Sequence, residues 1–299
     1  MTLVWGVALA QEPRVWVVTA EEGGVHAEAV AVLRGELDVA ITAHVDPEML
    51  ASGAAGPPEL IVTVGTAAFE RSLAWLRGKS SEWAGVPVLA SLLPRAAYEA
   101  RAAEAGRLRP VSGVVLDQPL SRQMALIRRA LPGYGRVGVL VGPQTQALLE
   151  ALGREARASQ LQLAPSPLVR DADALFPALR EVANNADVLL ALPEPLIYQA
   201  ANLQNILLAT YRARVPVVAF SPAYVKAGAL LAVYATPAQV ARETGTVARQ
   251  WLAGRGMAPV RAPREFAVSA NPRVAASLGI ALDDADRIAE DLRRAEGGR

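Results

Sequence analysis

The stretch that decides the fold is VPVVAFSPAYVKAGALL, residues 215–231. Its β-branched run at 215–220 predicts a short buried strand. A helix is predicted next, over residues 236–253, because Thr236 can cap it, Pro237 suits its first position and Gly254 follows its end. The stretches FAVSAN at 266–271 and VAASLGI at 274–280 then lead into a shorter helix, which Asn271-Pro272 and Gly279 bracket in the same manner.

Short apolar runs alternate with segments of helical period through the rest of the chain, which is the pattern of parallel sheets covered by helices. The predicted strands form two series, at 15–18, 39–42, 60–64, 86–90 and 111–115, and at 136–141, 161–163, 187–192 and 215–220. The predicted helices between them cover 25–37, 66–77, 95–105, 119–131, 145–159, 173–184 and 196–212. The fold class is therefore α/β, with two Rossmann-like lobes that each hold a parallel sheet.

Composition excludes several classes of function. The chain has 299 residues, a formal net charge of +1 and no basic block, so we expect no nucleic-acid partner. It has no cysteine, which rules out disulfides and thiolate catalysis. No apolar run approaches the ~20 residues of a membrane helix. The two histidines, His26 and His44, lack partners at metal-ligand spacing, and we interpret both as structural, with no metal or cofactor expected.

The first ten residues have the character of a processed leader. An apolar stretch ends in Ala8-Leu9-Ala10, an A-x-A cleavage pattern, although no basic segment precedes it. We expect residues 1–10 to be a signal-peptide remnant, with a ragged first strand as the alternative. Export to the periplasm would follow from this interpretation.

Four segments in order resemble one family. They are VSGV at 111–114, ALPGYGRVGVL at 130–140, the helix, strand and V-x-x-G-A step of 206–229, and the N-x-x-x-A-x-x-L-G-I close of 271–280. Together they are similar to the ABC-transporter substrate-binding proteins of the tryptophan and tyrosine type. The resemblance covers about residues 60–282. Two departures are Pro193-Glu194-Pro195, where the family often has P-x-D-N, and Ala241, where a glycine is common.

This resemblance implies a type I periplasmic-binding fold whose lobes are joined by a multi-strand hinge. Lobe 1 would contain residues 11–116 and 236–262, and lobe 2 residues 117–235 and 263–299. The implied function is the periplasmic solute-binding component of an ABC import system. A monomer would bind a small molecule, an amino acid or another carboxylate-bearing metabolite, between its lobes and deliver it to an inner-membrane permease.

Two other functions remain open. One is a sensing or regulatory domain on the same fold. The sequence shows neither a DNA-binding helix pair nor a membrane anchor, which counts against this alternative. The other is a two-Rossmann enzyme such as a glycosyltransferase. Residues 133–138, GYGRVG, have the G-x-G-x-x-G spacing, but they lead into the predicted strand at 136–141 instead of following a strand and opening a helix, so they do not match a nucleotide loop. Neither a P-loop nor a G-x-S-x-G turn occurs in the sequence. We therefore expect no catalytic residues.

The candidate ligand contacts follow from a general rule: open parallel sheets bind ligands beyond the carboxyl ends of their strands. The residues selected in this way are Thr19, Glu21, Gly65, Thr66, Ala67, Ser91, Gln144, Thr145, Glu194, Ser221 and Tyr224. Gly65-Thr66-Ala67 is the sharpest of these, since a helix start after a glycine favours a bound anion.

Each of the leading candidates has an alternative role. Thr66 could cap its helix instead of contacting a ligand. Glu194 could receive a ligand ammonium or hydroxyl, or complement a helix dipole. Tyr224 could stack on a planar ligand, whereas Tyr234 is expected in the core. Glu21 could face the ligand, or lie in a solvated turn before Gly23-Gly24, and the turn is the favoured interpretation.

Overall fold

The computed structural model describes residues 14–52, 54 and 56–297. The expected leader, residues 1–10, lies outside this range. The chain divides into two compact units, the first running to Val115 and resuming over Pro237–Pro263, the second comprising Leu116–Thr236 and Arg264–Arg299. The chain therefore passes from one unit to the other three times. Both units are α/β with sheets of mostly parallel strands, so the predicted fold class is confirmed.

The first unit is built on a five-stranded sheet in the order β2-β1-β3-β4-β5. Every neighbouring pair in it is parallel. Its strands are β1 (Arg14–Thr19), β2 (Ala40–His44), β3 (Leu60–Val64), β4 (Val88–Leu93) and β5 (Val111–Val115). Because all five strands run the same way, their carboxyl ends meet at one edge of the sheet.

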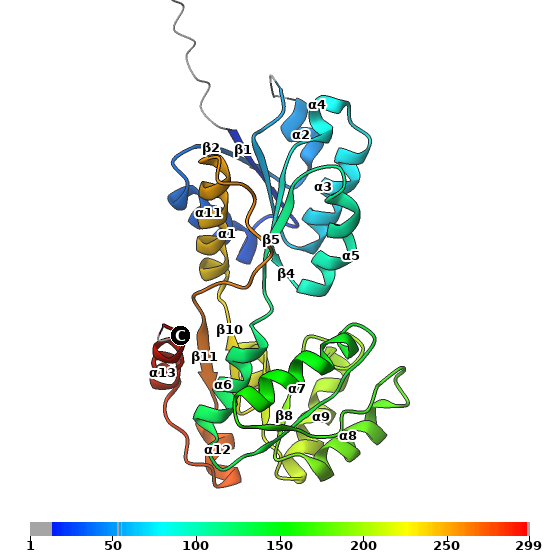
Figure 1. The fold of residues 1–299 in the computed structure, drawn as a ribbon, viewed down its shortest axis with the longest axis vertical. Coiled ribbons are helices and arrows are strands. Elements are labelled where there is room, and N and C mark those ends of the chain that lie inside the picture. Colours follow the sequence, from blue (N-terminus) through cyan, green and yellow to red (C-terminus); the bar gives the residue numbers. More distant parts are fainter. Residues whose placement is uncertain (1–13, 53, 55, 298–299) are drawn as a thin grey trace, which may run out of the picture. The chain divides into compact units, whose positions relative to one another are not determined.

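Helices cover both faces of this sheet. On one face α1 (Gly24–Glu36) lies beside α11 (Pro237–Leu252), and on the other α3 (Thr66–Arg77) lies beside α5 (Arg95–Ala105) (Figure 1). The short helices α2 (Pro47–Ser52) and α4 (Ser81–Ala84) pack against α3. A buried cluster that includes Trp16, Phe69 and Tyr98 fills the space under α3 and α5.

The second unit contains a six-stranded sheet in the order β11-β10-β9-β8-β6-β7. Its strands are β6 (Arg136–Val139), β7 (Gln162–Leu163), β8 (Val188–Leu190), β9 (Val217–Ala219), β10 (Leu231–Tyr234) and β11 (Ala267–Ala270). All neighbours are parallel except β10 and β11, which are antiparallel. One buried cluster joins the sheet to α6 (Leu120–Ala130), α7 (Leu149–Ala158) and α13 (Ala285–Gly297), and a second joins it to α8 (Leu175–Asn185), α9 (Ala200–Arg212) and α10 (Pro222–Ala227).

Local signals predicted the element ends best where a cap or a proline sets them. Helix α12 (Pro272–Leu278) is capped by Asn271, whose side-chain oxygen accepts from the Val274 N–H, and it ends at Gly279 with φ 71°. The helix predicted from residue 196 begins only at Ala200, and that predicted from residue 145 begins with a 3-10 turn at Gln146–Leu148. Helices α2, α4 and α10 were not predicted, because such short helices show little periodicity. Strands β10 and β11 were not predicted, because they depend on tertiary pairing. Helix α13 was also not predicted, although Ile288, Ala289 and Leu292 form a buried face on it.

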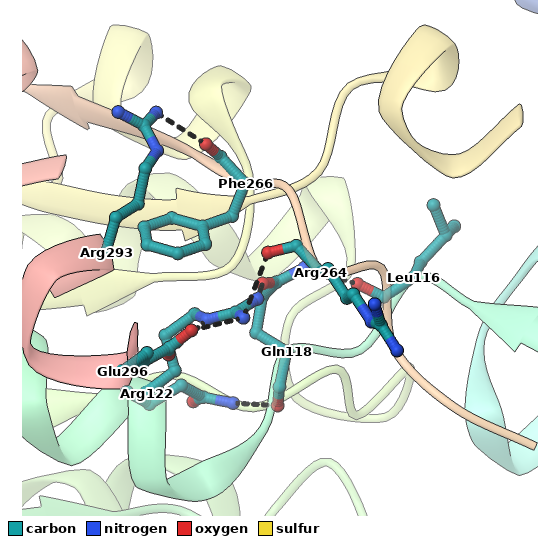
Figure 2. A network of polar contacts seen from close by, with 8 residues as sticks. Leu116, Gln118, Arg122, Arg264, Phe266, Arg293 and Glu296 are labelled. Atoms are coloured by element: carbon teal, nitrogen blue, oxygen red, sulfur yellow. Dashed lines mark hydrogen bonds and ion pairs between the residues drawn. The ribbon is translucent and has the colours of Figure 1, made fainter. Parts of the chain in front are cut away.

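A buried arginine in α6 binds three other parts of the second unit (Figure 2). The guanidinium of Arg122, 5% exposed, donates from Nε to Oε1 of Glu296 and from Nη2 to Oε2, each at 2.7 Å. It also donates to Oε1 of Gln118 at 2.8 Å and to the carbonyl of Arg264 at 3.2 Å, and lies 4.1 Å from the Phe266 ring centre. Gln118 and Arg264 stand just after two of the points where the chain enters this unit, so the network fixes α6, α13 and both incoming segments.

Candidate functional site

The carboxyl edge of the first sheet brings four of the predicted residues together. Thr19 ends β1, Gly65 and Thr66 follow β3, and Ser91 lies near the end of β4. Backbone hydrogen bonds continue the sheet past its strands here, from the Gly65 N–H to the Ser91 carbonyl at 2.8 Å and from the Ala20 N–H to the Val64 carbonyl at 2.9 Å. The start of α3 is thereby held firmly at this edge.

Gly65 is required at this turn for two reasons. Its φ of 96° lies in the region that side chains disfavour. A Cβ atom there would also come within 2.9 Å of the Ala20 Cβ and 3.0 Å of His26 Nε2. The absent side chain therefore allows the β1–α1 segment to approach the start of α3 closely.

The start of α3 carries no internal compensation for its positive end. Gly65, not Thr66, is the N-cap residue, and no side chain accepts a hydrogen bond there. The alternative that Thr66 caps the helix is therefore wrong. The first turn also contains no acidic residue. Because the first N–H groups of a helix have no intrahelical acceptor, this end of α3 is suited to an anion.

Other predicted residues of the first unit have different surroundings. Ser91 is 1% exposed, and its hydroxyl lies 2.8 Å from Oγ1 of Thr244, so it fastens α11 to the sheet. Thr19 and Glu21 line a shallow hollow of about 310 Å³ together with His44. Nδ1 of His44 accepts from the Asp46 N–H at 2.9 Å, which agrees with a structural role for this histidine.

In the second unit, Glu194 holds the loop that follows β6. Its Oε2 accepts from the N–H groups of Gln144 and Thr145, at 3.0 and 3.1 Å, and from the Thr145 hydroxyl at 3.0 Å. The Thr145 oxygen in turn accepts from the Gly142 N–H at 2.9 Å. Glu194 is 2% exposed. Its carboxylate thus already occupies the N–H groups that a ligand anion would need at this loop.

Gly142 makes room for this carboxylate. A Cβ atom at Gly142 would lie 2.5 Å from the Cδ of Glu194, far inside van der Waals contact. Thr145 and Glu194, each predicted separately as a ligand contact, are therefore brought together by the structure, and together they support the loop. Gln144 stays exposed beside them.

Ser221 and Tyr224 lie at the start of α10. Ser221 is the N-cap residue of this helix and makes no side-chain cap bond. The Tyr224 hydroxyl donates to the Tyr198 carbonyl, and its ring centre is 4.7 Å from that of Phe220. Burial raises the pKa of the Tyr224 hydroxyl. Tyr224 is thus half-buried in an aromatic cluster, and Tyr234 bonds to Ser269 across the β10–β11 pair.

His26 is a residue that sequence reasoning set aside. The structure places its imidazole beside Gly65, at the same edge as Thr66, and leaves it half-exposed. No sequence signal indicated this, since the contact depends on how α1 packs. Within the described part of the chain, no cluster of three or more His, Asp or Glu residues could hold a metal ion. No helix there is sufficiently long and apolar to span a bilayer.

The sequence of this chain matches the family model described as ABC transporter substrate binding protein over residues 105–289. That range is more than half of the 299 residues. A comparison with curated proteins found no match.

Several solved structures share the fold. A ligand-free, open substrate-binding protein with adhesive properties from Clostridium difficile is 14% identical, with a TM-score of 0.68, over 91% of this chain and 96% of its own. An ABC domain in complex with L-Trp from Streptococcus pneumoniae is 17% identical, with a TM-score of 0.58, over 93% and 98%. A conserved domain protein from Vibrio cholerae is 18% identical, with a TM-score of 0.55, over 93% and 98%. At these identities the likeness concerns the fold.

Proposed function

The chain belongs to the family of ABC transporter substrate-binding proteins, and we propose that it is the periplasmic solute-binding component of an ABC import system. The family match over residues 105–289 is the observation that carries this proposal. In this role the protein is a monomer without catalytic activity. It binds a small molecule and presents it to an inner-membrane permease.

The proposed ligand carries a carboxylate, which binds at the start of α3. Two observations support this placement. The positive end of α3 has no capping side chain and no acid in its first turn. The corresponding loop of the second unit is different, because Glu194 already accepts from the Gln144 and Thr145 N–H groups. The start of α3 therefore offers an anion N–H groups that no side chain occupies, whereas the loop after β6 does not. L-Trp, bound to the similar Streptococcus pneumoniae protein, also bears a carboxylate.

The predicted contacts divide into two groups in this proposal. Gly65, Thr66 and Ala67 bind the carboxylate. The other direct contacts, from both units, are Thr19, Glu21, Gln144 and Ser221, to which we add His26. The remaining predicted residues, Ser91, Thr145, Glu194 and Tyr224, hold these contacts in position through the hydrogen bonds described above. Binding of the ligand favours a ligand-bound state of the protein that the permease distinguishes from the free protein.

A thermal-shift screen tests the function. Amino acids, peptides, sugars, nucleosides and vitamins are added singly to the purified protein. A ligand at a hundred times its Kd stabilises the folded state by about 2.7 kcal/mol. For units of this size that raises the melting temperature by about 5–10 °C. A complete screen without any such shift would contradict the proposal.

The carboxylate contact is tested by two variants at one position. Thr66→Pro keeps a residue that suits the first helical turn, yet it removes one N–H group from the anion site. Thr66→Ala removes only the hydroxyl and keeps that N–H group. We expect Thr66→Pro to weaken a carboxylate ligand about tenfold or more, and Thr66→Ala to weaken it less. The ligand's uncharged amide should bind wild type and Thr66→Pro alike. Equal loss of the acid and its amide would place the carboxylate elsewhere.

A further inference from the structure

A second cavity lies in the first unit, in the groove between α3 and α5. Its volume is about 280 Å³, and its apolar lining comes from Leu73, Ala74, Ala105 and Leu108. The side chain of Leu108 is 61% exposed at its mouth. We call this cavity the α3–α5 pocket.

The α3–α5 pocket is separate from the candidate ligand site. Helix α3 starts at the carboxyl edge of the sheet and runs back, so Arg77, its last residue, lies toward the amino edge. Arg109, which also lines the pocket, stands just before β5 begins at Val111. The pocket is therefore displaced toward the edge of the sheet opposite to Gly65 and Thr66.

Arg109 is the unusual group in this pocket. Its side chain is 5% exposed, and its Nε and Nη1 are buried without a hydrogen-bond partner. Among the described residues, the guanidinium makes no ion pair either. Burial lowers the pKa of Arg109, although an arginine stays charged at neutral pH. A buried cation without a partner is unfavourable, so such a group indicates a missing anion.

The acids of the pocket do not supply that anion. Glu104 pairs with Arg77 at 3.2 Å, and Glu70 pairs with Arg101 at 3.4 Å. Both pairs are exposed and connect α3 with α5 at the rim. With these four charges matched, the charge of Arg109 remains the one uncompensated charge of the lining.

We propose that the α3–α5 pocket binds a small organic anion, a carboxylate on an apolar body, with the carboxylate on Arg109 and the apolar part against Leu73 and Ala105. Guanidinium and carboxylate match in both charge and hydrogen-bond geometry. The pocket volume of about 280 Å³ is just below the range of about 300–1,000 Å³ for small-molecule sites, which favours a compact ligand. This site is independent of the ligand site proposed above.

Benzoate is a suitable probe, and benzamide is its neutral control. Binding to the full chain is measured by calorimetry, and amide chemical shifts locate it. We expect saturable benzoate binding with shifts concentrated in 70–77 and 101–109, and much weaker benzamide binding. Arg109→Met should weaken benzoate about tenfold or more, because a hydrogen-bonded charge is lost. Arg107→Met changes an exposed arginine of the same turn that does not line the pocket, and it should bind as wild type does.

The ligand site at α3 could also accept benzoate, and Thr66→Pro separates the two. Binding at the α3–α5 pocket persists in Thr66→Pro and is lost in Arg109→Met. Three results would overturn the proposal. They are binding that is lost in Thr66→Pro and persists in Arg109→Met, equal affinity in wild type and Arg109→Met, and an absence of saturable binding to wild type. If Arg109→Met does not fold, Arg109→Gln replaces it with the same expected loss.

Discussion

Replacing Arg122 by methionine should destabilise the second unit strongly. Methionine fills much of the same space but makes none of the hydrogen bonds of the guanidinium. It loses both bonds to Glu296, the bond to Gln118 and the bond to the Arg264 carbonyl. The contact of the charge with the Phe266 ring is lost as well.

The magnitude follows from the burial of the two partners. Breaking a fully buried pair costs about 3–5 kcal/mol. Arg122 is 5% exposed, whereas the Glu296 side chain is 36% exposed, so water can solvate the remaining carboxylate. We therefore expect the free energy of unfolding to fall by about 3 kcal/mol, near the lower end of that range. Glu296→Gln retains one acceptor for Arg122 and should cost about 1–2 kcal/mol.

Two spectroscopic signals assign the effect to a unit. The five tryptophans of the chain all lie outside the second unit. Urea unfolding is followed by tryptophan fluorescence, which reports the first unit, and by far-UV circular dichroism, which reports both. We expect Arg122→Met to lower the circular-dichroism midpoint and to shift the fluorescence midpoint less.

The control is an exposed ion pair on a helix of the same unit. Arg154 and Glu150 pair at 2.6 Å with side chains 57% and 88% exposed. Arg154→Met should change the stability by less than about 0.5 kcal/mol. If Arg122→Met were no more destabilising than this control, the reasoning from burial would be refuted.

Three further outcomes follow from the structure. Gly142→Ala should reduce the stability by about 1–3 kcal/mol and so lower the thermal midpoint, because the new methyl group collides with the Glu194 carboxylate. The double variant with Glu194→Ala should recover part of this loss in the same thermal scan. Gly65→Ala should weaken ligand binding in calorimetry and also lower the melting temperature, because φ 96° disfavours a side chain and the β1–α1 segment must move; wild-type affinity would contradict the role of this turn. Burial acts to raise the pKa of Asp187, but hydrogen bonds from Arg136 and two backbone N–H groups lower it overall. The stability from Asp187 is therefore present above its unfolded pKa and is lost as pH falls through the lower folded value; acid unfolding of Asp187→Asn should lack this component, and an identical pH profile would exclude it.

The sequence determined much of the fold by local means. A buried parallel strand needs only a short β-branched run, and a helix end needs only a cap or a stop, so β3, α3 and α5 were predicted at both ends. Asn271 and Gly279 set α12 for the same reason. The strand-end rule also located the edge where Gly65 and Thr66 lie, because the direction of parallel strands fixes which loops meet.

What the side chains do at that edge depended on the tertiary structure. The sequence made Glu194 a candidate ligand contact. In the folded chain its carboxylate binds Gln144 and Thr145, in a loop about fifty positions earlier in the sequence. His26 entered the candidate site only through the packing of α1. The partner of Arg122 is 174 positions away in α13, a helix that the sequence pattern did not predict. Strand and helix formation is governed by neighbours in the chain, and the sequence contains those neighbours. Whether a buried charge finds a partner, as Arg122 does and Arg109 does not, depends on distances between segments that only the folded chain sets.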